Sequence, residues 1–160
     1  MPIQVGDQMP NVTLQHLTAD GLDSIETGAY FSGKKAVLFA VPGAFTPTCS
    51  ANHLPGFIDS ADAFKAKGID EVICTAVNDP FVMKAWGEQN GVGGKVTMLP
   101  DGNGLLAAAL GLQMDGSHAG LGTRSQRLAM VIDNGEVTAL MVEEPGQFEV
   151  SSAEYVLGKL

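Results

Sequence analysis

Cysteine is scarce in this chain, and its scarcity limits the chemistry that the chain can hold. Only two cysteines, Cys49 and Cys74, occur among 160 residues. Two thiols do not make a disulfide-stabilised scaffold, so they indicate a reducing compartment or thiols kept for chemistry. They also form no Cys-x-x-Cys pair. A dithiol exchange site of the usual kind is therefore excluded.

Basic residues and long apolar runs are also few. Nine Lys and Arg stand against eighteen Asp and Glu, a net charge of −9. This balance argues against a nucleic-acid partner. No apolar run approaches the roughly 18 residues of a membrane span, and the first residues do not resemble a secretory signal. We therefore expect a soluble, cytoplasmic protein with no membrane partner.

Linkers and internal repeats are missing too. Apolar residues make up 45% of the chain and charged residues 17%, a composition typical of a folded protein. A length of 160 residues fits one domain with a substantial core. We expect a single domain over residues 1–160.

Strand-like and helix-like segments alternate along the chain. Strands are predicted over 12–14, 35–41, 70–77, 95–99, 128–133 and 136–142. Helices are predicted over 48–67 with a kink at Pro55-Gly56, from Asn78 or Asp79 to about residue 89, over 103–110 before Gly111, and from Ser151 in a capping box with Glu154. Asn134-Gly135 signals a hairpin between the last two strands. The order predicts an α/β fold: a central mixed sheet flanked by helices.

Cys49 occupies the most informative position. The apolar strand 35–41 ends at Pro42-Gly43, and Pro47 suits the first turn of a following helix. Cys49 then falls in or near that first turn, where unpaired N–H groups and the helix dipole favour a thiolate. A buried cysteine acting as a small apolar side chain is the alternative. The strand–turn–helix context favours the reactive thiol.

Three other side chains are candidates for assisting this thiol. The hydroxyl of Thr46 can donate to the sulfur or to a bound oxygen, or accept, although it could equally be a turn or cap residue. Arg124 and Arg127 are the candidate permanent cations, and Arg127 is better placed because it immediately precedes a strand. Solvated loop charges are the alternative for both arginines.

The histidines do not indicate a metal site. His16, His53 and His118 are scattered, without metal-ligand spacing to one another or to cysteine. His53 follows Cys49 by four residues and could face it across one helical turn. A structural role for His53, in holding the helix or in an interface, is favoured.

These residues match a known family. The segment 42–49 resembles the Pro-x-x-x-Thr-x-x-Cys signature of peroxiredoxins, and the match extends from 5–7 to 151–154. Segments 53–57, 77–86 and 124–127 resemble the subgroup of plant type II peroxiredoxins, the mammalian fifth peroxiredoxin and bacterial relatives. Four motifs in the right order make the resemblance specific.

The resemblance implies a thioredoxin-like fold and a thiol-dependent peroxidase that reduces hydrogen peroxide and alkyl hydroperoxides. Cys49 would become a sulfenic acid, with Thr46 as its hydroxyl partner and Arg127 as its cation. Pro42 would shield the sulfur, and backbone N–H groups from Gly43 onward would bind the peroxide. No metal, haem or flavin cofactor would be needed.

The resemblance also concerns the substrate-binding residues and the second cysteine. Arg124 is placed with Pro42 and Gly43 in substrate binding. Cys74 matches the second cysteine of plant type II enzymes, proposed to resolve the sulfenic acid, but an inert core thiol is equally consistent with its apolar strand. The mammalian relative has its resolving cysteine where this chain has Ser151. If Cys74 is inert, glutathione with glutaredoxin, or thioredoxin, must reduce Cys49 from outside.

Two other functions compete with the peroxidase. A thiol-disulfide exchange protein would lack its second motif cysteine. A chaperone-like interaction module would use apolar surface from Phe45, Phe81 and Trp86. We interpret these aromatic residues as core or interface residues of an enzyme, and the resemblance suggests a homodimer with Phe45 and Phe81 in contact.

Overall fold

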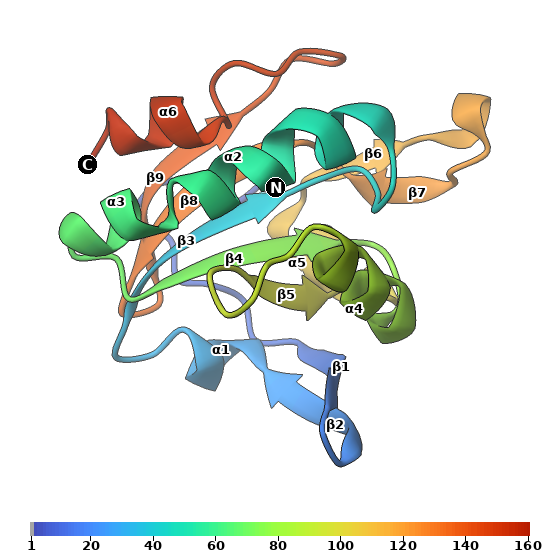
Figure 1. Ribbon diagram of the computed structural model, residues 1–160, viewed down its shortest axis with the longest axis horizontal. Helices are drawn as coiled ribbons and strands as arrows, with labels where there is room; N and C mark the ends of the chain where they lie inside the picture. Colours follow the sequence, from blue (N-terminus) through green and yellow to red (C-terminus); the bar gives the residue numbers. More distant parts are fainter. Residues whose placement is uncertain (1) are drawn as a thin grey trace.

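A five-stranded mixed sheet forms the centre of the molecule (Figure 1). The computed structural model describes residues 2–160, and their side chains except that of Cys49. The strand order is β5-β4-β3-β8-β9. The parallel strands are β3 (Lys35–Ala40), β4 (Glu71–Ala76) and β5 (Thr97–Pro100); the antiparallel strands are β8 (Leu128–Asp133) and β9 (Glu136–Val142). The predicted mixed sheet is confirmed.

Shorter elements surround this sheet. Two small antiparallel pairs are β1 (Thr13–Thr18) with β2 (Gly21–Glu26), and β6 (Gln113–Asp115) with β7 (Thr123–Ser125). The helical segments are α1 (Thr27–Tyr30), η1 (Cys49–His53), α2 (Leu54–Asp59), α3 (Ala61–Ala66), α4 (Pro80–Gln89), α5 (Leu105–Leu110), η2 (Ser117–Ala119) and α6 (Ala153–Leu157). No helix in the described part of the chain is long and apolar enough to cross a membrane.

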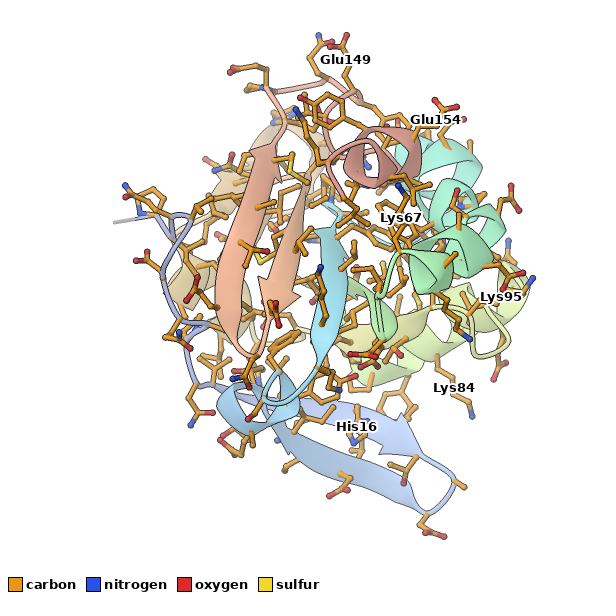
Figure 2. All side chains as sticks on the ribbon, turned by 90° about the vertical axis from the view of Figure 1, so that its left-hand side faces the viewer. His16, Lys67, Lys84, Lys95, Glu149 and Glu154 are labelled. Atoms are coloured by element: carbon orange, nitrogen blue, oxygen red, sulfur yellow. The ribbon has the colours of Figure 1, made fainter. Side chains whose placement is uncertain are left out.

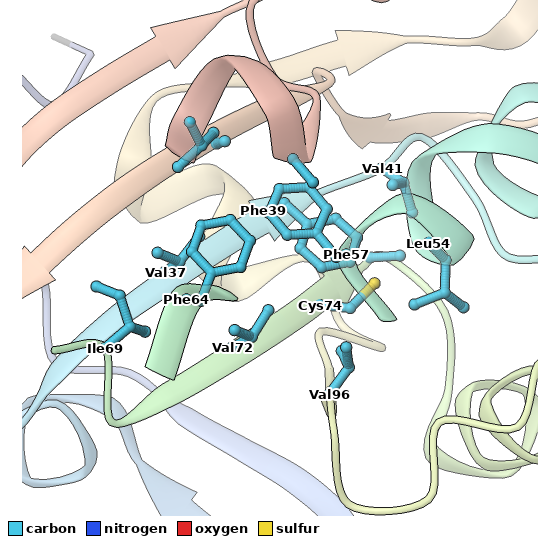
Figure 3. Close-up of a cluster of buried hydrophobic side chains, with 14 of the residues drawn as sticks. Val37, Phe39, Val41, Leu54, Phe57, Phe64, Ile69, Val72, Cys74 and Val96 are labelled. Atoms are coloured by element: carbon cyan, nitrogen blue, oxygen red, sulfur yellow. The ribbon is translucent and has the colours of Figure 1, made fainter. Parts of the chain in front are cut away.

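The core lies on both faces of the sheet. One face packs against α2, α3, α4 and α6, and the other against α5, α1 and the amino-terminal segment. Figure 3 shows the first face, where the Phe39 ring of β3 stacks on Phe57 of α2 at 4.0 Å between ring centroids. Phe57 stacks in turn on Phe64 of α3 at 5.5 Å. This aromatic stack holds the helices that follow Cys49 against β3.

Several predicted boundaries are confirmed. Asp79 caps α4, since its side chain accepts from Val82 N at 2.8 Å. Gly111 ends α5 with a left-handed φ of 71°. Asn134 and Gly135 have φ of 49° and 83°, as a tight hairpin turn between β8 and β9 requires.

Two predictions about helices are wrong. The segment predicted as one helix over 48–67 is interrupted: it begins with a widened π turn, η1, continues as α2 and breaks at Ser60 before α3. A proline ring crowds the carbonyl four residues earlier, and the wide turn before Pro55 relieves that contact. The last helix is capped by Ser152, whose Oγ accepts from Tyr155 N at 3.2 Å, and not by Ser151 in a box with Glu154.

Charged side chains cover the outside. Figure 2 shows Lys84 and Lys95 pointing outward, and the β1–β2 hairpin, which carries His16, lying below the central sheet, where β1 contacts β5 and α4. The β2 strand of this hairpin is half-exposed or exposed along its whole length. The candidate functional residues lie elsewhere, beyond the carboxyl end of β3.

Candidate active site

The loop after β3 places a helix start at the carboxyl end of the strand, where open α/β sheets hold their sites. Thr46 N donates to Gly43 O at 3.4 Å, and Ser50 N donates to Thr46 O at 2.9 Å as the helix begins. Phe45 lies between them with φ of 66°, in the left-handed region that non-glycine residues rarely adopt. Strained backbone of this kind concentrates at functional sites.

Neighbouring elements hold this loop in position. Ala44 N donates to Asn78 Oδ1 at 2.9 Å, and Trp86 Nε1 donates to Ser50 Oγ at 3.0 Å. Both partners come from the 77–86 segment that begins α4. Asn78, which the sequence suggested as a helix cap, therefore fixes the loop, while Asp79 makes the cap.

Cys49 begins the π turn η1, two residues after Pro47 opens the helix. Its predicted place in or near the first turn is confirmed. The N–H groups of a first helical turn have no partner within the helix and favour an anion. The side chain of Cys49 lies outside the described part of the structure, so its assignment as the reacting thiol stays a prediction.

Thr46 uses its hydroxyl proton locally. Its Oγ1 donates to Gly43 O at 2.7 Å. A hydroxyl has one proton and two lone pairs, so the remaining capacity of Thr46 is to accept. Of the two roles that the sequence left open, this arrangement favours accepting a hydrogen bond over donating one.

Arg127 is held by a buried imidazole. Its Nη1 lies 2.8 Å from His53 Nδ1, and its guanidinium lies 5.8 Å from the Phe148 ring centroid. His53 is completely buried, and its Nε2 lies 2.9 Å from Ser151 O. Because a carbonyl only accepts, His53 carries its proton on Nε2 and accepts from Arg127 at Nδ1.

The electrostatics keep this imidazole neutral. Burial, and then the charge of Arg127, lower the pKa of His53 from 6.5 to about 3. The structural role favoured for His53 is confirmed by its contact with Ser151. Its contact with Arg127 was not predicted, because positions 53 and 127 are joined only by the folded topology.

Arg124 holds the backbone of the loop. Its Nε donates to Leu121 O at 2.9 Å and its Nη1 donates to Pro42 O at 3.1 Å. A Cβ at Gly43 would lie 2.6 Å from that Nη1, so a larger residue there would displace the guanidinium from this position. Its assignment to substrate binding stays a prediction.

A cavity of about 620 Å³ opens beside Arg127. Pro42 and Thr48 line it from the loop and helix start, Met114 and Leu121 from the β6–β7 segment. Residues 143–147 complete the wall. Its volume is in the range of small-molecule sites. The described residues contain no group of three or more His, Cys, Asp or Glu side chains that could hold a metal ion.

Comparison with known proteins identifies the family. The Redoxin family profile matches residues 4–157. Peroxiredoxin-2D of Arabidopsis thaliana is 49% identical over 160 residues, covering 99% of each sequence. The chain belongs to the peroxiredoxin family. The crystal structure of reduced Prx3 from Vibrio vulnificus in complex with H2O2 is 53% identical, covers 98% of each chain and superposes with a TM-score of 0.95. The predicted resemblance and the thioredoxin-like fold are confirmed.

The second cysteine of this peroxiredoxin lies in the core. Cys74 is fully buried in β4, and its register partner on β3 is Phe39. Figure 3 shows its sulfur among the apolar side chains that include Leu54 and Val96. The apolar strand predicted around Cys74 is confirmed. The role of Cys74 as a resolving cysteine for Cys49 stays a prediction.

Proposed function

We propose that this peroxiredoxin reduces hydrogen peroxide and alkyl hydroperoxides at the carboxyl end of β3, through a sulfenic acid on Cys49. Membership of the family makes the chain a thiol-dependent peroxidase. The observation that carries the site assignment is the place of Cys49 at a helix start, directly after Thr48, which lines the same cavity as Arg127. Together these features favour a thiolate and a bound oxygen anion.

The proposed step needs no cofactor. The Cys49 thiolate attacks the terminal oxygen of the hydroperoxide, an S–O bond forms and the O–O bond breaks. Cys49 becomes a sulfenic acid, and the departing oxygen leaves as hydroxide or alkoxide, which takes a proton to give water or an alcohol. Arg127 stabilises the negative charge as it develops on that oxygen.

The loop residues position the peroxide. Thr46 accepts a hydrogen bond from the peroxide O–H, because its own proton is directed to Gly43 O. Pro42 shields the sulfur, and backbone N–H groups after Gly43 bind the second oxygen. Arg124 supports this arrangement by fixing the Pro42 carbonyl.

An external thiol completes the cycle. The burial of Cys74 supports this route, because a buried thiol is a slow nucleophile and can meet another cysteine only if the structure around it opens. Glutathione with glutaredoxin, or thioredoxin, are the proposed reductants. An outside thiol reaches the helix start from the cavity without opening the core.

A homodimer through the active-site loops is the proposed assembly. Phe45 and Phe81 are large apolar residues with 48% and 61% of their surface exposed. Aromatic side chains are enriched at the centres of protein–protein interfaces. Phe81→Glu should weaken self-association in sedimentation velocity, whereas Val5→Glu, at another exposed apolar position (60%), should not.

Stopped-flow peroxide consumption tests the function. The wild type should consume hydrogen peroxide rapidly with at least one of glutathione, glutathione plus glutaredoxin, or thioredoxin, and Cys49→Ser should not. Consumption that is unchanged in Cys49→Ser would refute the assignment of Cys49. A wild type that reduces protein disulfides but not peroxide would favour the thiol-disulfide exchanger instead.

A further inference from the structure

Glu143 is a buried carboxylate that the proposed peroxide chemistry does not use. It follows β9 and exposes 7% of its surface. Its Oε2 accepts from Glu149 N at 2.7 Å, Ser151 N at 2.8 Å and Ser151 Oγ at 2.6 Å. Burial disfavours its charge, but the Ser151 and Glu149 donors outweigh burial and lower its pKa. These bonds close residues 143–151 into one loop, here the 143–151 loop.

This loop contacts the Arg127 side chain through two rings. The Ser151 carbonyl accepts from His53 Nε2, and the Phe148 ring centroid lies 4.9 Å from that of His53. Phe148 also lies beneath the Arg127 guanidinium. Glu143 N donates to Arg127 O at 3.0 Å, so the loop is joined to the main chain of Arg127 as well.

The tautomer of His53 depends on this loop. A neutral imidazole has one proton, and the Ser151 carbonyl draws it to Nε2. Nδ1 then presents a lone pair to Arg127 Nη1. If Ser151 moved away, the proton could reside on Nδ1, and two N–H donors would face each other across 2.8 Å.

We propose that Glu143 is a positioning residue for the peroxidase site, acting through Ser151 and His53 on Arg127. Glu143 fixes Ser151, Ser151 fixes the His53 tautomer, and His53 fixes the guanidinium. The proposal rests on the proposed function of Arg127 beside Cys49. It assigns the 143–151 loop a part in the chemistry, although Glu143 itself touches no reacting atom.

The first test compares two Glu→Gln variants. Glu143→Gln should lower kcat/KM for hydrogen peroxide about tenfold, by analogy with the lower end of the effect of partners that orient metal-ligating side chains. It should also raise the ionisation midpoint of Cys49, measured by alkylation at that residue against pH with mass spectrometry. Glu71→Gln is the matched control. Glu71 also accepts several hydrogen bonds, from Lys34, Tyr30 and Thr97, but it lies at the amino end of β4, away from the site at the carboxyl end of the parallel strands. Glu71→Gln should lower the melting temperature and leave both kcat/KM and the ionisation midpoint of Cys49 unchanged.

A second test separates the two nitrogens of His53. His53→Asn keeps an acceptor near the Nδ1 position for Arg127 but cannot reach Ser151. His53→Gln keeps a donor near the Nε2 position for Ser151 but offers no acceptor at the other nitrogen. The proposal expects His53→Asn to have a higher kcat/KM than His53→Gln, even if His53→Asn has the lower melting temperature of the two variants. A purely structural role would rank both variants by stability.

The results that would overturn the proposal are distinct from those that would overturn the peroxidase. Glu143→Gln with a wild-type kcat/KM and an unmoved Cys49 midpoint, in a protein that consumes peroxide, would refute only the positioning role. If Glu143→Gln does not fold, Ser151→Ala replaces it: loss of the hydroxyl bond should give a smaller change in the same direction, and no change would refute the role. The Cys49 midpoint tests the proposal even if the wild type consumes no peroxide.

Discussion

Arg127 supplies the positive charge of the site, and a neutral partner, His53, fixes its position. The guanidinium donates to His53, a neutral acceptor that fixes its direction without adding negative charge. Thr46 is oriented in the same manner, because donation to Gly43 O turns its lone pairs outward. Arg127 and Thr46 therefore each use part of their hydrogen-bonding capacity to hold the site in place. The remaining donors of Arg127 and lone pairs of Thr46 are left for the substrate.

Arg127→Lys should reduce kcat/KM for hydrogen peroxide by about 10–100-fold while leaving the fold intact. Lysine keeps the charge but loses the planar fork that can contact His53 and an oxygen anion together, and a hydrogen bond to a charged group contributes roughly 1.5–3 kcal/mol. Arg124→Lys is the control and should have the smaller effect on kcat/KM, since its contacts are to backbone carbonyls. The reverse order would show that the cation is misassigned.

Thr46→Val should slow the oxidation of Cys49, and Thr46→Ser should retain most of the rate. Valine keeps the shape and removes both the bond to Gly43 O and the outward lone pairs, whereas serine keeps both. Single-turnover stopped flow with hydrogen peroxide measures the step directly. An unchanged rate in Thr46→Val would leave Thr46 only the role of a turn residue.

At the scale of elements, predictability follows burial and local chemistry. The strands β3 and β4 could be predicted because five of the six residues in each are buried and apolar runs reveal them. β6 and β7 have three residues each, and β2 is largely exposed, so none has a hydrophobic pattern to detect. The π turn at η1 was missed because a proline signals a disturbance without saying whether the preceding turn widens or the axis bends.

The burial of Cys74 in β4 leads to a prediction about the catalytic cycle. Because Cys74 is fully buried, it can meet Cys49 only if the helix start opens, which costs free energy. Cys74→Ser should keep most turnover with glutathione and glutaredoxin and lose more with thioredoxin, which acts on a protein disulfide. Mass spectrometry after one equivalent of peroxide should find glutathione on Cys49 in both proteins. A quantitative Cys49–Cys74 disulfide, with turnover lost in Cys74→Ser for every reductant, would contradict this.

At the scale of the whole molecule, topology joins segments that are distant in sequence. The loop after β3, the start of β8 and the 143–151 loop meet at one end of the sheet. Cys49, Thr46 and Arg127 could be proposed from local motifs and family resemblance. The contacts of His53 with Arg127 and Ser151 could not, because no local pattern reports a pairing across 74 or 98 residues.

The same buried histidine should make global stability depend on pH. The unfolded chain binds a proton on His53 near pH 6.5, but the folded chain does so only near its pKa of about 3. Between these values the unfolded state holds more protons, so stability falls as the pH falls below 6.5. From pH 7.5 to 5.5 the loss from this group should be about 1.4 kcal/mol. Urea unfolding measures it, and His53→Phe, though less stable overall, should lack this part of the pH dependence; an equal dependence in both would contradict a neutral buried His53.

The central claim is that Cys49 reacts with peroxide, and trapping its oxidised form tests this most directly. Reduced protein is mixed with one equivalent of hydrogen peroxide in the presence of a probe specific for sulfenic acids, and the labelled residue is found by mass spectrometry. The account predicts one probe per chain on Cys49, formed far faster than on a free small-molecule thiol, with Cys74 unlabelled. Labelling of Cys74 alone, or oxidation of Cys49 no faster than that of a free thiol, would contradict it.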